Sequence, residues 1–216
     1  MKMESIGILT GLRPINERDC VARVFTRDSG VWVGVMRGAA VAKKNRPMIG
    51  QYGNVVWNAR LDSQLGTMHW DAEKNLAAVL MARPMELGLM NAAFDLINVM
   101  LPERESYAVL FDNTLRLMGN LANGITDAYL MWEMELLAQL GYAMDLSRCS
   151  GCGTTNDLNF VSPRTGRAVC DVCAAPYVDR LYRLPVTLDV TLGFLNAACV
   201  QQGVEIPVMR KMLKHV

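Results

Sequence analysis

Four of the six cysteines stand in two tight pairs, and this spacing constrains the fold more than any other feature of the sequence. The pairs are Cys149 with Cys152 and Cys170 with Cys173, and seventeen residues separate them. Two Cys-x-x-Cys pairs about 15–20 residues apart are typical of a zinc site. Four thiolates complete a tetrahedron around one ion and leave no open position. The spacing therefore predicts one structural Zn²⁺ per chain.

Two disulfides, unliganded thiols or a redox dithiol are the alternatives for these cysteines. Disulfides require an oxidising compartment, and residues 1–20 carry charges throughout and lack the apolar core of a signal peptide. A redox dithiol ordinarily needs only one Cys-x-x-Cys. We therefore favour zinc. Cys20 and Cys199 each stand alone in apolar company and are assigned to the core.

The composition describes a chain that can bury a core in one or two domains, with 216 residues, 51% hydrophobic and 20% charged. The longest clean apolar run, Leu76 to Ala82, is far shorter than the ~18 residues of a membrane helix. We expect a cytoplasmic protein without membrane contact.

Charge is divided unevenly along the chain. Residues 1–75 carry eleven Lys or Arg against seven Asp or Glu, residues 76–148 carry four against nine, and residues 149–216 carry seven against five. A basic front, an acidic middle and a mildly basic end indicate separate modules with separate partners.

The first seventy-odd residues show an apolar period of two, with turn signals such as Asp28-Ser29-Gly30 between the strands. Five short strands are predicted, at residues 5–12, 21–27, 30–38, 54–61 and 66–70. Five strands in so few residues suit a closed OB-fold barrel, which hides its edges by curling. A five-stranded SH3-like barrel is the alternative, and the pattern does not separate the two.

Two features of this barrel point to nucleic acid. On the second strand Arg23, Phe25 and Arg27 alternate to one face, and the loop after the third strand is rich in Lys and Arg. Cations hold phosphates, while aromatic rings and guanidinium planes stack on bases, and this combination binds single strands without reading sequence. A solvated turn is the alternative for the loop. The candidate nucleic-acid-binding residues are Arg23, Arg27, Arg37, Lys43, Lys44 and Arg46.

From Asp71 onward the apolar period becomes 3.6, which indicates helices. We predict helices over residues 72–82 with Asp71 as N-cap, 84–101, 105–121, 126–140 with Gly141 after its end, and 188–202 closing at Gly203. The fold class is α+β. Residues 1–75 form an OB-fold domain, and residues 76–216 form a helical domain with a zinc finger inserted at 147–176.

The sequence contains no recognisable arrangement of catalytic residues. His69 and His215 are the only histidines, and no Ser or Cys sits in a nucleophile motif. The phosphate-binding pattern GxxxxGK[ST] does not occur, so ATP hydrolysis is not expected. We predict a non-enzymatic protein with no catalytic residues.

Three stretches resemble one family over essentially the whole chain. The first contains Glu17 and Asp19, then VFTRDSG (residues 24–30) and Arg37-Gly38. The second is LLAQLGYAMDLSRC (136–149), and the third is FVSPRTGRAVC (160–170). In their order and spacing they resemble RecO, a family of bacterial recombination mediators and strand-annealing proteins.

The resemblance implies an N-terminal OB-fold, a helical bundle and a zinc-finger insertion. It also implies binding to single- and double-stranded DNA, annealing of complementary strands without ATP, and loading of the recombinase RecA together with RecR. The acidic tail of single-stranded DNA-binding protein (SSB) is a further implied partner, with Arg210, Lys211 and Lys214 as candidate contacts. A nucleoid-associated location in the cytoplasm follows from these roles.

Two departures from the family pattern stand out. The basic loop holds fewer charges than is usual, and the sequence ends amid RKMLKHV, where relatives usually continue into further helix. A zinc-stabilised protein adaptor that does not touch nucleic acid is the competing function. A metalloenzyme is disfavoured, because four cysteines would leave no open metal position.

Overall fold

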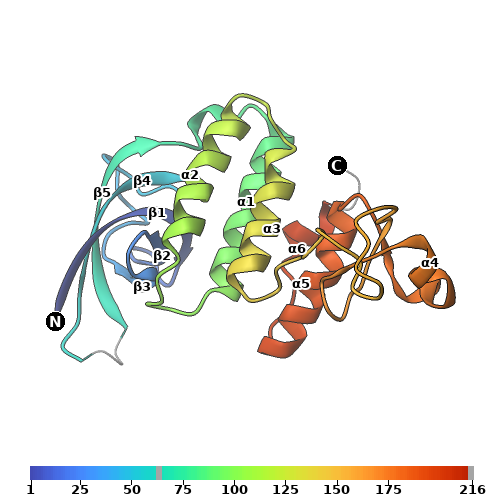
Figure 1. The fold of residues 1–216 in the computed structure, drawn as a ribbon. Helices are drawn as coiled ribbons and strands as arrows, with labels where there is room; N and C mark the ends of the chain where they lie inside the picture. Colours follow the sequence, from blue (N-terminus) through green and yellow to red (C-terminus); the bar gives the residue numbers. More distant parts are fainter. Residues whose placement is uncertain (62–64, 214–216) are drawn as a thin grey trace. The chain divides into compact units, whose positions relative to one another are not determined.

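A computed structural model describes residues 1–61 and 65–213 (Figure 1). The chain divides into two compact units. Unit 1 comprises Met1–Ala128 with Pro207–Arg210, and unit 2 comprises Tyr129–Ile206 with the residues from Lys211 onward. Each unit is described by itself.

Unit 1 begins with a closed barrel of five strands, as the alternation predicts. The strands are β1 (Lys2–Pro14), β2 (Cys20–Thr26), β3 (Gly30–Met36), β4 (Gln51–Asn58) and β5 (Gly66–Asn75). Their order around the barrel is β1-β2-β3-β5-β4, with β1 antiparallel to β4 and β3 parallel to β5. This is the Greek-key arrangement of the OB-fold, so the α+β prediction with an OB-fold barrel is confirmed.

The barrel core consists of side chains from alternate positions of the strands, among them Leu9, Val24, Trp32 and Trp57. One glycine is required by its surroundings. Gly30 has φ +62°, and a Cβ built on it would lie 1.9 Å from the carbonyl oxygen of Glu105. Only glycine fits a position with positive φ and this close approach, so the turn predicted at Asp28-Ser29-Gly30 also accommodates the backbone of Glu105.

The predicted helix over residues 72–82 is wrong. β5 continues through this stretch to Asn75, whose register partner is Gln51 on β4, and only a 3-10 turn, η1 (Ala78–Leu80), follows. The sequence AEKN has fair helix propensity, but pairing with β4 satisfies its backbone groups, and tertiary context overrides so weak a preference. A bulge between Tyr52 and Gly53 absorbs the change of register.

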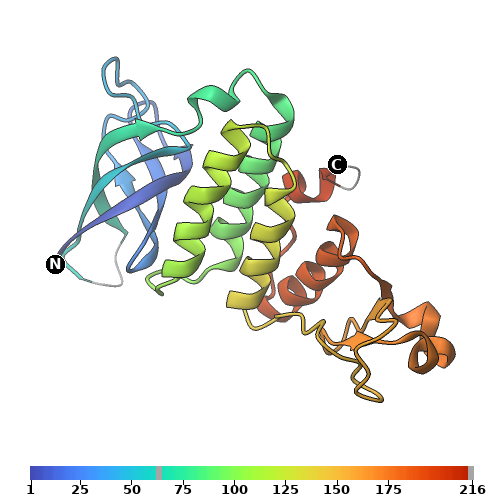
Figure 2. The ribbon, with the colours of Figure 1, turned by 45° about the horizontal axis from the view of Figure 1, so that its top comes forward.

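Two helices complete most of unit 1, α1 (Pro84–Met100) and α2 (Ala108–Ala122), and the views show them side by side next to the barrel (Figures 1 and 2). α1 begins at Pro84, which suits a first helical position because proline has no N–H to lose there. The buried face of α2 and its N-cap consists of Tyr107, Leu110, Phe111, Thr114, Leu117, Met118 and Leu121.

The helices are fixed to the barrel by packing and by hydrogen bonds. The rings of Phe25 on β2 and Phe111 on α2 meet edge to face, with centroids 5.4 Å apart. The Thr10 hydroxyl on β1 donates to Oδ1 of Asn98 on α1 over 2.8 Å, and Asn98 Nδ2 donates back to the Thr10 carbonyl over 3.0 Å. Unit 1 is therefore one barrel-and-helix body.

Unit 2 contains α3 (Ala128–Gln139), α4 (Asp171–Ala174), η2 (Ala175–Arg180) and α5 (Leu188–Gln202). A small sheet in the order β7-β6-β8 joins Ala168–Val169, Phe160–Val161 and Tyr182–Arg183. α5 has the predicted bounds, and Gly203 ends it in the left-handed conformation. The short α6 (Val208–Met212) was not predicted. No helix of the described residues is long and apolar enough to cross a membrane.

The Phe25–Phe111 contact gives a test of the unit 1 architecture. Phe111→Ala should destabilise unit 1 by about 3–5 kcal/mol, because it removes a buried ring and leaves a cavity. Phe111→Leu should cost clearly less, since it keeps most of the buried volume. Urea denaturation followed by the fluorescence of the buried Trp32 and Trp57 measures both. Equal, small effects of the two changes would contradict the packing described.

Candidate metal centre and nucleic-acid interface

The four paired cysteines converge on one point in unit 2. Cys149 and Cys152 lie in the loop before β6, Cys170 is the N-cap of α4, and Cys173 lies within α4. Their four Sγ atoms all lie within 4.8 Å of one another. The structure thus unites two pairs that are seventeen residues apart in sequence.

The sulfur positions suit a tetrahedral ion. Zinc binds thiolate at about 2.3 Å, which places two sulfurs of a tetrahedron about 3.8 Å apart. The Sγ atoms of Cys152 and Cys170 are 3.7 Å apart. A four-cysteine cluster can hold a metal ion, and with all positions taken by protein its role is structural rather than catalytic.

The backbone around the cluster favours thiolate at Cys149. The backbone N–H groups of Cys170 and Gly151 donate to Cys149 Sγ over 3.4 and 3.3 Å. These bonds, with that of Cys170 foremost, lower the pKa of Cys149 to about 6. Hydrogen bonds to the sulfurs of Cys152, Cys170 and Cys149 raise the pKa of Cys173 to about 12. Crowded sulfurs cannot all ionise unaided, and a cation among them removes that obstacle.

The cluster is also the centre of a very small core. Cys149 and Cys170 are buried together with Phe160, Val169 and Ala174, and Leu158, Cys173 and Leu181 pack against them. So few apolar side chains supply little folding free energy, and small domains of this kind commonly rely on a metal.

The basic loop follows β3 and carries Arg37, Lys43, Lys44 and Arg46. Its first residues are held by Arg18 and Asp19, from the first of the three stretches that resemble the family. Asp19 Oδ1 accepts the Gly38 N–H over 2.8 Å, and this bond is the main cause that lowers the pKa of Asp19. The Ala40 N–H donates to the Arg18 carbonyl over 3.0 Å, and Ala39 is buried in the barrel core. The loop therefore leaves the barrel from a fixed root.

The loop cations are exposed, and two of them, Arg46 and Arg37, line different hollows. Lys43, Lys44 and Arg46 are all exposed, and Arg46 borders an apolar hollow of about 460 Å³ lined by Met48, Met81 and Met90 among others. Arg37 instead shares a hollow of about 620 Å³ with Lys2 and Arg60.

Sequence reasoning missed Lys2 and Arg60. The antiparallel register of β1 with β4 pairs Lys2 with Asn58, and this brings the start of the chain to the end of β4. No local pattern in the sequence could reveal the grouping, because it depends on barrel closure.

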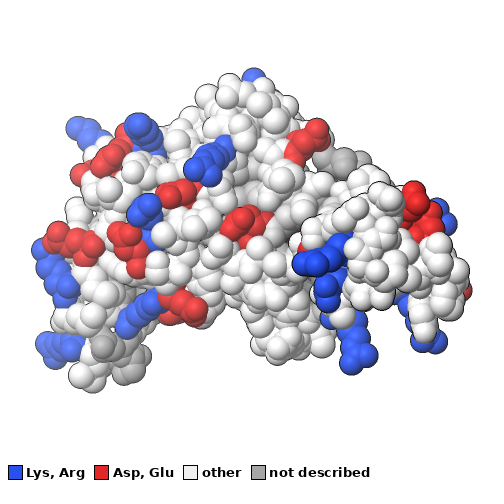
Figure 3. All heavy atoms as spheres, in the orientation of Figure 1, with Lys and Arg blue, Asp and Glu red and all other residues white. Residues whose placement is uncertain are grey.

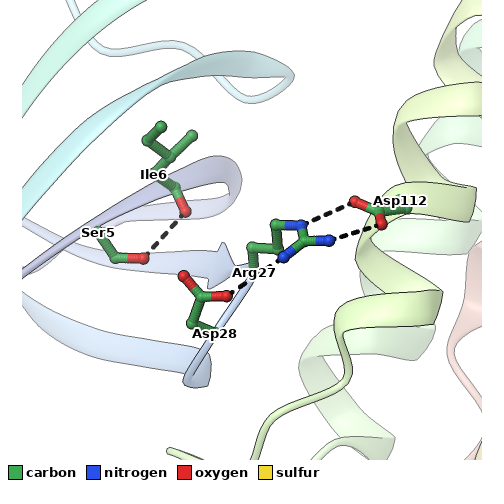
Figure 4. A network of polar contacts seen from close by, with 5 residues as sticks. All are labelled: Ser5, Ile6, Arg27, Asp28 and Asp112. Atoms are coloured by element: carbon green, nitrogen blue, oxygen red, sulfur yellow. Dashed lines mark hydrogen bonds and ion pairs between the residues drawn. The ribbon is translucent and has the colours of Figure 1, made fainter.

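Arg23 and Arg27 make contacts within unit 1. Arg23 Nη1 donates to the Asn98 carbonyl over 2.9 Å. Arg27 forms a two-pronged pair with Asp112 on α2, at 3.1 and 3.0 Å, and a 3.5 Å contact with Asp28 (Figure 4). Phe25 between them is fully buried, so it offers no surface on which a base could stack. This face of β2 serves to attach the helices.

The two C-terminal cations that the structure describes, Arg210 and Lys211, differ in accessibility. Arg210 is buried, so its side chain is not accessible as the predicted contact for an acidic tail. Lys211 is exposed, and Lys214 lies outside the described residues. Helix α6, with its buried Arg210, explains why a stretch that looks uniformly basic in sequence is not uniformly accessible.

On the face of the molecule shown in Figure 3, basic and acidic side chains alternate over the barrel. Over the cysteine-containing part of unit 2, basic side chains gather along the lower margin. Within this view, neither region carries a single extended basic patch.

The fold and the four-cysteine centre define an OB-fold protein with helices and an inserted zinc-finger-type site. Residues 1–71 match the family model "Recombination protein O N terminal", and residues 84–204 match "Recombination protein O C terminal". The chain belongs to the RecO family of DNA repair proteins.

Curated relatives named "DNA repair protein RecO" agree with this assignment. The relative from Dinoroseobacter shibae is 39% identical over 87% of this chain and 78% of its own length. The one from Jannaschia sp. (strain CCS1) is 38% identical over 88% and 78%. One from Cereibacter sphaeroides is 37% identical over 95% and 87%.

The metal centre can be tested by substituting one of its cysteines. Cys152→Ser should abolish metal binding and lower the thermal stability of unit 2, because a structural metal contributes its binding energy to folding. Cys152 is exposed, so a loss of core packing would not explain the result. Elemental analysis of protein purified without chelator should find about one equivalent of metal in the unaltered chain.

Cys199→Ala is the matched control for the metal. Cys199 is a buried cysteine outside the cluster, so this variant should keep its metal even if it loses stability. An unaltered protein without metal would contradict the assignment. On acidification the metal content should fall, because protons compete for the thiolates.

The Arg27–Asp112 pair predicts a dependence of stability on pH. The hydrogen bond from Arg27 lowers the pKa of Asp112 below its ordinary value of 3.8. A carboxyl with a lowered folded pKa stabilises the fold above its unfolded pKa, and this contribution is lost as pH falls through the folded pKa. The difference in unfolding free energy between the unaltered chain and Asp112→Asn should be constant above about pH 5 and shrink below about pH 4.

The control for this pair is the same substitution in an Arg27→Ala background. Without the guanidinium, Asp112→Asn should show a much weaker dependence on pH. Denaturation curves at a series of pH values measure both comparisons, and an equal pH dependence in the two backgrounds would count against the pair.

Proposed function

We propose that this chain is a non-enzymatic DNA repair protein that binds single- and double-stranded DNA and anneals complementary strands without ATP. Its membership of the RecO family supports a role in repair and recombination. The observation that carries DNA binding is the basic loop: three exposed cations stand on a loop whose root is fixed to an OB-fold barrel. Such barrels commonly bind oligonucleotides.

The loop suits contact with a phosphate backbone rather than with base edges. Lys43, Lys44 and Arg46 are exposed side chains on a surface loop, and flexible cations of this kind neutralise phosphates without specifying sequence. Arg37, with Lys2 and Arg60, adds a second group of cations on the same barrel. Arg23 and Arg27 are auxiliary at most, since both bind within unit 1.

The ion in the four-cysteine centre is Zn²⁺ in this proposal, because an all-thiolate tetrahedral set is the preferred structural site of zinc. The centre orders residues 149–174 and takes no part in chemistry. RecR, the acidic tail of SSB and, through them, RecA are the proposed protein partners, on the strength of family membership. The proposed setting is the nucleoid in the cytoplasm.

The loop generates the prediction that tests DNA binding. For a single strand, log affinity falls with log salt by about 0.7 per phosphate contact. Four contacts, from Arg37, Lys43, Lys44 and Arg46, give a slope near −3, which means roughly a fifty-fold loss between 50 and 200 mM salt. Changing Lys43, Lys44 and Arg46 together to Ala should flatten the slope by about two and weaken binding to all sequences alike.

The matched control removes the same charge elsewhere on the barrel. Arg13, Arg18 and Lys74 are exposed, and changing all three to Ala should leave the slope nearly unchanged. Fluorescence anisotropy with labelled oligonucleotides measures affinity and slope. If the loop variant binds as the unaltered chain does, the loop is a solvated turn. If the unaltered chain binds no DNA, the protein is an adaptor instead.

Annealing has its own prediction. Without a nucleotide-binding motif, annealing must come from holding two strands together, so its rate should be the same with and without ATP. A strand-pairing assay with two complementary labelled oligonucleotides measures this rate. An absolute requirement for ATP would contradict the proposal.

A further inference from the structure

Unit 2 carries a hollow lined by arginines, hydroxyl-bearing residues and apolar residues, with no acidic side chain in the lining. Its volume is about 630 Å³. Three arginines line it, Arg164, Arg167 and Arg180, together with Tyr177. Hydroxyl groups of Ser150, Ser162 and Thr165 complete its polar lining. We call this feature the arginine hollow.

The local fold places the arginines around the hollow. The turn between β6 and β7 is closed by the bonds of Gly166 N–H to the Ser162 carbonyl, 2.9 Å, and of Ser162 N–H to the Arg167 carbonyl, 3.0 Å. This turn carries Arg164 and Arg167, while Arg180 is the last residue of η2. The four-cysteine centre joins the loop of Cys149 to α4, the helix that η2 follows, so a metal bound there would order the walls.

The arginines of the hollow are available for a ligand. Arg164 and Arg180 are exposed, and among the described residues no acidic group lies within ion-pair distance of either. Arg167 has one long contact, 3.8 Å from its Nε to Asp145 Oδ2. The hollow in unit 1 beside Arg27 differs, since Glu4, Asp28 and Asp112 line it as well.

The chemistry of the lining fits one ligand class. Guanidinium groups bind phosphates by two parallel hydrogen bonds, and hydroxyls add donors. Tyr177, with 55% of its surface exposed, presents a ring beside them. Aromatic rings and guanidinium planes stack on unpaired bases. An acidic peptide would use the arginines but gain little from an exposed ring, so the lining favours a nucleic-acid strand over an acidic protein.

We propose that the arginine hollow is a second single-strand DNA-binding site, separate from the basic loop. The inference rests on the proposed function and deepens it. Annealing without ATP requires one protein to hold two strands, and the chain then has one strand site on each compact unit. Tyr177 stacks on a base, while Arg164 and Arg180 neutralise the flanking phosphates.

A tryptophan at position 177 tests the site directly. Trp32, Trp57 and Trp132 are buried and Trp70 is half-buried, so acrylamide quenching of a Tyr177→Trp variant reports mainly on the hollow. The variant is made in the full chain that also carries the Lys43, Lys44 and Arg46 to Ala changes, which weaken the first site. Adding a single-stranded oligonucleotide should protect the new tryptophan from acrylamide.

A second experiment removes positive charge from the arginine hollow. In the same background, Arg164→Ala with Arg180→Ala should lower the magnitude of the salt slope by about 1.4, for two lost contacts at about 0.7 each. The matched control is Arg148→Ala with Arg183→Ala, which removes two exposed arginines of the same unit that do not line the hollow. It should leave the slope unchanged. Metal content confirms that every variant has kept its fold.

The outcomes separate the inference from the proposed function. Protection of the tryptophan, lost in the Arg164/Arg180 variant and kept in the control, supports the site. An oligonucleotide that binds the unaltered chain but leaves the tryptophan unprotected overturns the inference and leaves the proposed function standing. Stronger protection by a polyglutamate peptide than by the oligonucleotide overturns it too, in favour of an acidic protein partner. If no DNA binds to any variant or to the unaltered chain, both fail.

Discussion

The hydrogen bonds that join β1 to β4, and β3 to β5, close the barrel of unit 1 and remove its free edges. The cation groups of this unit depend on that closure. It brings Lys2 and Arg60 beside Arg37. The pairing of β2 with β3, which sets Cys20 opposite Met36, lets Asp19 just before β2 accept the N–H of Gly38 after β3. The basic loop between β3 and β4 therefore starts from a rigid barrel, and its cations extend from that fixed point.

The closed barrel also decides which arginines remain available to partners. Phe25 on β2 packs against Phe111 of α2, while Arg23 on β2 bonds to Asn98 of α1 and Arg27 just after β2 pairs with Asp112 of α2. Charge alone therefore does not mark a binding residue. A guanidinium with a two-pronged carboxylate partner serves the protein itself, whereas Lys43 and Lys44 extend into solvent.

Unit 2 is stabilised in a different way from unit 1. Around the cysteines there are too few apolar side chains for an ordinary core, and four sulfurs within 4.8 Å supply a centre that a metal can bind together. A metal that cross-links these loops would hold them in one conformation, which so few apolar contacts cannot do alone. Those loops carry the arginine hollow, so the four-cysteine centre and the proposed second strand site belong to the same local structure.

The local features could be predicted from the sequence: the barrel strands, the helices α1, α2, α3 and α5, and the four cysteines of the candidate metal centre. Each follows from a short-range signal, such as a period of 2 or 3.6, Pro84, Gly203 or the Cys-x-x-Cys spacing. The other features depend on contacts between segments far apart in the sequence. Residues 72–75 became strand because β4 pairs with them, and Arg210 became buried. The groupings of Lys2 with Arg60 and of Arg164 with Arg180 depend on contacts between distant segments, and no local pattern encodes these.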